Sequence, residues 1–346
     1  MNPLSTDLDH ILAHTEGLWE ELRGQRIFIT GGTGFFGCWL LESFAWANDK
    51  LGLNASAVIL TRNVDAFRKK VPHLAEHPAI RLLAGKVQKF DFPPGKFSHV
   101  IHAATESAVG TGPQDHQRLF DDDIVATRHV LEFAETRQVQ RLLFTSSGAV
   151  YGRQPFDITH LTEDYCGTPD TMSPNTCYGQ AKRVSEYLCR LAAERGCIQT
   201  TVARCFAFVG PHLRLDANFA IGNFTRDALR GGPIHVNGDG TPYRSYLYAA
   251  DLAIWLWTIL LRGQSGRAYN VGSDTALTIA ELAQLVADVV NPAAKVIIAQ
   301  QPNPATPPQR YVPSIQRART ELGLTPWIDT CEGIRRMAEW ERSCWK

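Results

Sequence analysis

The stretch Thr-Gly-Gly-Thr-Gly-Phe-Phe-Gly at residues 30–37 directly follows the apolar run Ile27-Phe28-Ile29 and is the most informative part of the chain. A buried strand that leads into glycines and then into an apolar helix is typical of the phosphate-binding turn of a dinucleotide-binding fold. Gly31 permits the tight turn, Gly34 lets the backbone approach the pyrophosphate, and Gly37 lets the helix pack closely on the strand. The helix N-terminus offers N–H groups and the positive end of its dipole to an anion. We therefore predict that this turn binds a dinucleotide.

Strand and helix patterns alternate along the first 200 residues. Apolar strand runs are expected at residues 27–30, 57–61, 80–83, 98–102, 141–145 and 199–203. Helices are expected at residues 35–47, 64–70, 118–137 and 178–195, and beyond residue 205 at 220–230, 250–262, 278–290 and 330–342. This alternation predicts an α/β fold with a doubly wound parallel (Rossmann) sheet. We expect an N-terminal helical extension (1–24), a NAD(P)-binding domain (25–204) and a smaller C-terminal α/β substrate lobe (205–346) that interleaves with it.

Composition narrows the class of protein. The 346 residues carry 35 basic and 35 acidic side chains, which argues against non-specific binding to nucleic acid or to a membrane surface. No apolar run is long enough to span a bilayer, and the N-terminus lacks the basic region of a secretory signal. The eight cysteines form no CxxC pair and the eleven histidines form no HExxH motif. We therefore expect a cytoplasmic protein with reduced thiols and no metal site.

Three side chains form a predicted catalytic group. Tyr178 and Lys182 stand four residues apart in a predicted helix, so they share one face, one turn apart. A neighbouring ammonium favours the charged form of a phenol, so that a tyrosine can pass a proton near neutral pH. Ser147 lies at the carboxyl end of an apolar strand, within Leu-Phe-Thr-Ser-Ser-Gly-Ala-Val-Tyr-Gly (143–152). Each feature alone is common, but their order after the glycine turn predicts catalysis.

These motifs resemble those of the extended short-chain dehydrogenases/reductases, the NAD(P)-dependent epimerase/dehydratase family that acts on nucleotide sugars. The family's TGxxGFxG pattern is matched at 30–37, SSxxVYG at 146–152 and YxxxK at 178–182, and the resemblance runs from Gln25 to Trp340. It implies that Tyr178 is the acid–base group, that Lys182 holds the nicotinamide ribose and tunes the tyrosine, and that Ser147 hydrogen-bonds the reacting sugar oxygen. The cofactor contacts implied are Gly31, Thr33, Gly34, Phe35, Phe36, Gly37, Arg62, Ala103, Ala104, Tyr178 and Lys182.

The C-terminal part carries expected substrate contacts. Residues 238–251 are similar to the family's GxGxxxRDFxxVxD segment, which implies that Arg244 binds the diphosphate of the substrate. A guanidinium suits this role because it pairs bidentately with phosphate oxygens. Asn223 and Arg310 look like further diphosphate contacts, and Glu106, which follows the fourth strand, is expected to face the sugar. A plain surface position is the alternative for Arg244, Asn223 and Arg310.

The end of the second strand indicates the cofactor. NAD-preferring relatives carry an acidic residue there, which binds the ribose hydroxyls of the adenosine. Here the strand reads Ala-Val-Ile-Leu-Thr-Arg-Asn (57–63), so the acid is missing and Arg62 stands beside its expected place. A carboxylate would repel a 2′-phosphate, whereas an arginine would bind one. We therefore predict that NADP(H) is favoured over NAD(H).

The residues after Ser147 bear on the reaction. The resemblance implies an Asp-Glu pair here in 4,6-dehydratases and a Glu in decarboxylases, whereas this chain has Gly148 and Ala149, which cannot transfer protons. We therefore expect hydride exchange at C4 of a nucleotide-diphosphate sugar, by an epimerase or a 4-ketoreductase. A dehydratase or decarboxylase with a relocated carboxylate is the alternative.

A non-catalytic NADP-sensing or assembly protein is the alternative of another class, and the intact group of Ser147, Tyr178 and Lys182 argues against it. The resemblance also implies a homodimer, packed through the helices near 118–137 and 178–195. Asp123, in the first of these helices, stands where the family often has asparagine.

Overall fold

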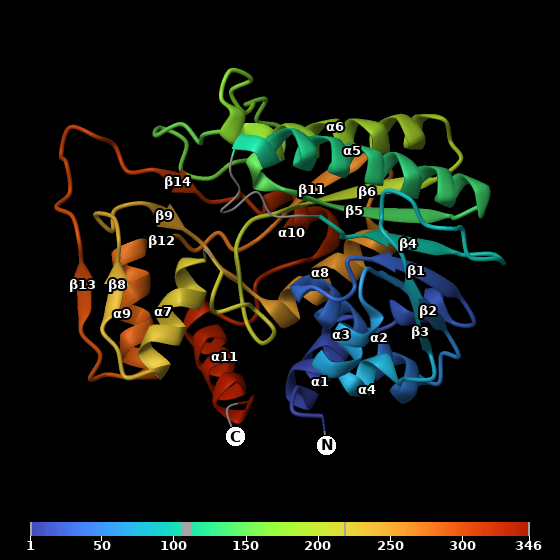
Figure 1. Ribbon diagram of the computed structural model, residues 1–346, viewed down its shortest axis with the longest axis horizontal. Coiled ribbons are helices and arrows are strands. Elements are labelled where there is room, and N and C mark those ends of the chain that lie inside the picture. Colours follow the sequence, from blue (N-terminus) through green and yellow to red (C-terminus); the bar gives the residue numbers. More distant parts are fainter. Residues whose placement is uncertain (1, 106–112, 218, 345–346) are drawn as a thin grey trace. The chain divides into compact units, whose positions relative to one another are not determined.

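The computed structural model describes residues 2–105, 113–217 and 219–344 (Figure 1). The chain forms two compact units. Unit 1 comprises Met1–Val150, Pro169–Arg204 and Ala253–Tyr269, and unit 2 comprises Tyr151–Thr168, Cys205–Leu252 and Asn270–Lys346. Glu106, one of the expected substrate contacts, lies outside the described residues.

The central sheet has seven strands in the order β11-β6-β5-β4-β1-β2-β3. Their bounds are β1 Arg26–Thr30, β2 Ser56–Thr61, β3 Ile80–Ala84, β4 His99–His102, β5 Arg141–Ser147, β6 Gln199–Cys205 and β11 Arg267–Val271. β1 pairs in parallel with both β2 and β4, so the strand order reverses at β1. Open α/β sheets bind ligands outside the carboxyl ends of their strands at such a switch point. The predicted doubly wound α/β fold is confirmed.

Helices cover both faces of this sheet. They are α1 Ser5–His14, α2 Phe35–Leu51, α3 Val64–Lys70, α4 Pro72–Ala75, α5 Pro113–Thr136, α6 Cys177–Glu194 and α8 Ala249–Arg262, with short 3₁₀ turns at Trp19–Leu22, Gly148–Tyr151 and Pro174–Thr176. Figure 1 shows α5 and α6 on one face and α2 and α8 on the other. The indole N–H of Trp257 in α8 donates to the hydroxyl of Ser43 in α2 (2.9 Å), which joins the two helices of the second face.

Aromatic side chains fill the core between the sheet and α5. The Phe28 ring of β1 lies 4.5 Å from that of Phe133 in α5, and Phe90 and Phe97 pack around both. All four rings are buried, so this cluster fixes the position of α5 against the sheet. The helix carries Asp123 toward the site described below.

Unit 2 is built from short strands and helices. They are β7 Phe208–Val209, β8 Ile234–Val236, β9 Tyr243–Arg244, β10 Leu247–Tyr248, β12 Leu277–Thr278, β13 Val296–Ile298, β14 Arg310–Tyr311, α7 Ala220–Leu229, α9 Ile279–Val290, α10 Gln316–Leu322 and α11 Thr330–Cys344. The strands form the groups β12-β9-β14, β13-β8 and β10-β7. α9 starts with a capping box, in which Thr278 and Glu281 exchange side-chain to backbone hydrogen bonds.

Two properties of the described residues concern the class of protein. No helix among them combines the length and the apolar character needed to cross a bilayer. The eight cysteines are all free thiols, and Cys38, Cys189 and Cys205 are buried.

Candidate functional site

The glycine turn has the shape of a phosphate cradle. β1 ends at Thr30 and α2 begins at Phe35, and Gly31 between them has a φ of +73°. A Cβ at Gly31 would lie 2.5 Å from the carbonyl of Ala103, and one at Gly37 would lie 2.2 Å from the carbonyl carbon of Gly32. No residue with a side chain fits either place, which agrees with the tight turn predicted at Gly31 and the close helix packing predicted at Gly37. The structure brings Gly31 together with Ala103 and Ala104, two other predicted cofactor contacts.

A buried histidine connects the glycine turn to α5. The hydroxyl of Thr30 accepts from the amide of Ala104 (3.2 Å) and lies 2.8 Å from Nδ1 of His102, whose Nε2 lies 3.3 Å from the hydroxyl of Thr127. Burial, and secondarily the charge of Lys182, lowers the pKa of His102 to about 3. The ring is therefore neutral, and the Thr30 contact favours the tautomer that carries its proton on Nε2. Sequence reasoning missed His102, because nothing local marks it as buried.

Tyr178 and Lys182 lie together as their spacing predicted. Both belong to α6, where Tyr178 is half-buried and Lys182 is buried. The Lys182 ammonium lies 5.6 Å from the centre of the tyrosine ring and 4.8 Å from that of Phe144, and it donates to the carbonyl oxygen of Thr145 (3.4 Å). The ammonium is thus held between α6 and the carboxyl end of β5.

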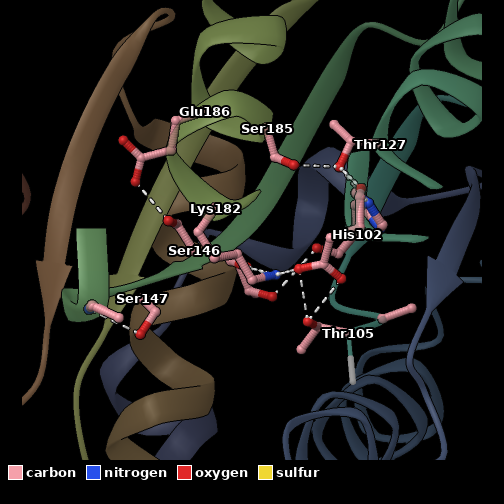
Figure 2. A network of polar contacts seen from close by, with 12 residues as sticks. His102, Thr105, Thr127, Ser146, Ser147, Lys182, Ser185 and Glu186 are labelled. Atoms are coloured by element: carbon pink, nitrogen blue, oxygen red, sulfur yellow. Dashed lines mark hydrogen bonds and ion pairs between the residues drawn. The ribbon is translucent and has the colours of Figure 1, made fainter. Parts of the chain in front are cut away.

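Asp123 supplies a carboxylate to this lysine. Its Oδ2 lies 3.4 Å from Nζ of Lys182, and the two side chains are 11% and 2% exposed. The hydroxyl of Thr105 reaches both carboxylate oxygens, at 3.0 and 3.1 Å. Figure 2 shows Lys182 and Thr105 converging on this point, with Thr127 between His102 and Ser185 nearby. Asp123, which stands where the family often has asparagine, therefore forms a buried ion pair with Lys182, a predicted catalytic residue.

Ser147 ends β5, where the sequence placed it. Its hydroxyl accepts from the amide of Ala149 (3.1 Å). The preceding Ser146 instead donates to Glu186 (2.6 Å), which also forms an ion pair with Arg204 (2.7 Å). Figure 2 shows these two serines directed to different partners.

Gly179 allows the helix that carries Tyr178 to approach this strand end. A Cβ at Gly179 would lie 2.6 Å from the carbonyl oxygen of Ala149. A glycine inside a helix lowers the stability of that helix by about 1 kcal/mol relative to alanine. At Gly179 the missing side chain permits the close packing of α6 on the segment after Ser147.

The end of β2 has the predicted basic character. Arg62 directly follows the strand and is exposed. The next residue, Asn63, caps α3 by accepting from the amide of Ala66 (2.9 Å). Lys70, at the other end of α3, reaches the glycine turn and donates to the carbonyl oxygen of Thr33 (3.1 Å). Sequence reasoning did not single out Lys70.

Unit 2 contains a cavity of about 770 Å³ that Asn223 lines. The guanidinium of Arg226 donates to the Asn223 amide oxygen (3.2 Å) and is ion-paired with Asp227 (2.8 Å). Arg230 and His235 bring further basic side chains to the wall. Arg226 follows Asn223 by three residues in α7, so helical spacing was the signal that could have identified it.

Arg244 and Arg310, two predicted phosphate ligands, occupy neighbouring strands of unit 2. In the β9–β14 pair, Arg310 is opposite Tyr243 and Tyr311 is opposite Arg244. The Arg310 guanidinium lies 4.0 Å from the Tyr243 ring centre, and that of Arg244 lies 5.8 Å from the Tyr311 ring centre. Stacking on tyrosine restricts each planar guanidinium. The cavity wall includes Asn223 but neither of these arginines.

Comparison with known proteins identifies relatives over most of the chain. A family model described as the NAD dependent epimerase/dehydratase family matches residues 27–272. UDP-glucuronic acid decarboxylase 1 from Arabidopsis thaliana is 29% identical over 313 residues, which cover 90% of this chain and 68% of the relative. UDP-glucuronic acid decarboxylase 1 from Danio rerio is 28% identical, with 91% and 72% covered. The resemblance predicted from the motifs, and with it the prediction of an enzyme, is confirmed.

Solved structures share the fold. UDP-glucose 4-epimerase from Thermotoga maritima, a complex with UDP-glucose, has a TM-score of 0.77 and 20% identity, and covers 93% of this chain and 100% of its own. The dTDP-glucose 4,6-dehydratase from Bacillus anthracis, a complex with NAD, has a TM-score of 0.74 and 18% identity, with 92% and 97% covered.

Proposed function

This chain belongs to the NAD-dependent epimerase/dehydratase family, and we propose that it exchanges hydride at C4 of a nucleotide-diphosphate sugar, as a 4-epimerase or a 4-ketoreductase. The end of β5 carries this proposal. Ser147 is followed by Gly148 and Ala149, whose side chains include no acid or base. The Tyr178–Lys182 pair is therefore the proton-transfer group of this site. Elimination and decarboxylation require a further acid or base, whereas hydride exchange needs only one group that moves the hydroxyl proton.

The carboxylates that contact this site support the same reaction. Asp123 is paired with Lys182, and Glu186 is paired with Arg204 while it accepts from Ser146. Each carboxylate is thus held within the protein by a cation and a hydroxyl group, Asp123 by Lys182 and Thr105 and Glu186 by Arg204 and Ser146. A relocated acid for dehydratase or decarboxylase chemistry is therefore not supplied by either residue.

The catalytic residues have separate roles in this proposal. When bound, the nicotinamide supplies the hydride acceptor or donor. Tyr178 takes the proton of the sugar O4 hydroxyl or returns it, and Ser147 hydrogen-bonds the same oxygen. Lys182 binds the nicotinamide ribose and places its positive charge beside the tyrosine ring, 5.6 Å away, where it favours the phenolate.

Unit 2 is the proposed binding region for the nucleotide diphosphate. Arg244 and Arg310 are oriented by tyrosine rings and suit bidentate phosphate contacts. Asn223 lines the cavity and keeps its carboxamide NH₂ without a partner among the described residues. Relatives of this fold are complexes with UDP-glucose or UDP, and we infer a related ligand here.

NADP(H) is the cofactor that we propose, although several neighbours are complexes with NAD or NADH. The residues around the end of β2, from Ala57 to Asn63, include no acid that would repel a 2′-phosphate, and the exposed Arg62 would attract one.

A homodimer through α5 and α6 is part of the proposal. Val130 and Phe133, which contribute to the apolar pattern of α5, are buried within unit 1 and do not argue for it. Its support is two exposed side chains on these helices, Val125 (47%) and Tyr187 (62%).

One set of assays on the purified chain tests the reaction. The protein is denatured and any released nicotinamide is identified by mass spectrometry, and the native protein is then offered three substrates. Interconversion of UDP-glucose and UDP-galactose indicates an epimerase, and NADPH oxidation with a dTDP-4-keto-6-deoxy sugar indicates a reductase. Conversion of UDP-glucuronate to UDP-xylose would overturn the proposal, as would NADP binding with no turnover of any nucleotide sugar.

A further inference from the structure

The last residue of α3 reaches the glycine turn. Lys70 lies 37 residues after Thr33, yet its Nζ is 3.1 Å from the Thr33 carbonyl oxygen. The same ammonium lies 3.8 Å from Sγ of Cys38 in the first turn of α2. The side chain is otherwise exposed, so this reach orients a long and flexible lysine toward one point of the turn.

Neither contact neutralises the ammonium. A carbonyl oxygen carries no net charge, and burial raises the pKa of the Cys38 thiol to about 11, so the thiol is uncharged at neutral pH. No carboxylate of the described residues lies within ion-pair distance of Lys70. Lys70 therefore presents an uncompensated positive charge beside the phosphate cradle, with donors left over after the Thr33 contact.

A second cation is placed at the same edge of the sheet. β1 and β2 are neighbours, with Thr30 opposite Leu60, and Arg62 is the first residue after β2. In a dinucleotide-binding fold the adenosine ribose binds at the end of this strand, and a nearby basic residue accommodates a 2′-phosphate. The turn that Lys70 contacts follows β1, and Arg62 follows β2, so a cation stands at the carboxyl end of each of these two neighbouring strands.

We propose that Lys70 is a specificity-determining residue that binds the ribose 2′-phosphate of NADP(H) together with Arg62. This inference rests on the proposed preference for NADP(H), and it assigns part of that preference to Lys70. A lysine ammonium is a compact charge that suits one phosphate, whereas it adds little for the 2′-hydroxyl of NAD(H). The Thr33 contact holds the ammonium in place before the cofactor arrives.

Binding titrations of the full chain test this proposal without relying on turnover. NADPH and NADH are titrated against wild type, Lys70→Gln, Lys70→Arg and the control Lys69→Gln, which removes the neighbouring exposed lysine of the same helix. The same proteins are titrated with 2′,5′-ADP and 5′-AMP. Loss of one charged hydrogen bond weakens binding by about 10-fold or more, so we expect Lys70→Gln to lose this factor for NADPH and 2′,5′-ADP alone. Lys70→Arg should restore most of it, and Lys69→Gln should resemble wild type.

The outcomes separate the two levels of the proposal. If wild type prefers NADPH and Lys70→Gln keeps the same NADPH-to-NADH ratio, the assignment of Lys70 is wrong and the preference stands. If Lys70→Gln weakens both cofactors equally, the lysine only supports the turn, and the assignment is again wrong. If wild type binds NADH as tightly as NADPH, the preference and the inference built on it both fail.

Discussion

The buried ion pair between Lys182 and Asp123 should couple the two residues strongly. Two unit charges 3.4 Å apart attract by about 5 kcal/mol at an effective dielectric constant of about 20. Desolvation offsets part of this, but removal of one partner leaves the other charge buried, which costs about 3 kcal/mol or more. We therefore expect Asp123→Asn and Lys182→Met each to lower the free energy of unfolding by about 3 kcal/mol. The double variant should cost less than the sum, by about 2 kcal/mol.

Urea unfolding of the four proteins measures this coupling, followed by both tryptophan fluorescence and circular dichroism so that coincident transitions justify a two-state analysis. The exposed pair of Arg190 and Glu194, one turn apart in the same helix, gives a matched control cycle. Its side chains are 53% and 55% exposed, so its coupling should stay below about 0.5 kcal/mol. A coupling energy at the buried pair no larger than at this surface pair would show that the buried charges do not stabilise each other as expected.

Three further changes test other parts of the structure. Tyr178→Phe removes the proton-carrying hydroxyl, so turnover should fall by orders of magnitude while nicotinamide binding, followed by fluorescence titration, is unchanged; near-normal turnover would contradict its role. Gly31→Ala should abolish cofactor binding because its Cβ would lie 2.5 Å from a backbone carbonyl, whereas Gly24→Ala, at a similar positive φ in open space, should bind normally. Equal binding by the two alanine variants would argue against the packing explanation. His73→Gln tests a pH effect, because the contact with Glu42 (2.7 Å) raises the pKa of His73 above 6.5. The stabilisation is present below pH 6.5 and lost as the pH rises through the raised pKa, so the variant should melt below wild type at pH 6 and match it at pH 9, by less than about 1 kcal/mol for this half-exposed ring. A gap of the same size at both pH values would sink this explanation.

Segments whose structure is set locally were predictable from the sequence. The helix expected at residues 64–70 is α3, Val64–Lys70, because an Asn cap and a basic last turn mark its two ends. The strand expected at 141–145 is β5, Arg141–Ser147, which ends two residues later and so includes Ser147. The i, i+4 spacing likewise gave the contact between Tyr178 and Lys182. In each case the evidence lay within one element.

Features that depend on distant partners were not predictable. β11 (Arg267–Val271) is short and includes Arg and Asn, so its strand conformation depends on pairing with β6 rather than on a local apolar pattern. Asp251, in the first turn of α8, accepts from the amides of Trp327 and Ile328, both 2.9 Å from its carboxylate, and its local sequence does not indicate this contact. The contact of Asp123 with Lys182 joins α5 to α6, and only the packed helices reveal it.

The two lysines beside the proposed cofactor site differ in what their charge can do. Lys182 is buried and its charge is balanced by Asp123, so it adds little net attraction for an anionic cofactor and acts on its immediate neighbour Tyr178. Lys70 is exposed and, among the residues that the structure describes, contacts only neutral groups, so its charge remains available to a phosphate. Raising the salt concentration should therefore weaken NADPH binding through Lys70 and leave the Lys182 pair nearly unaffected, because ions screen exposed charges far more than buried ones. A salt dependence of NADPH binding that is unchanged in Lys70→Gln would contradict this division of roles.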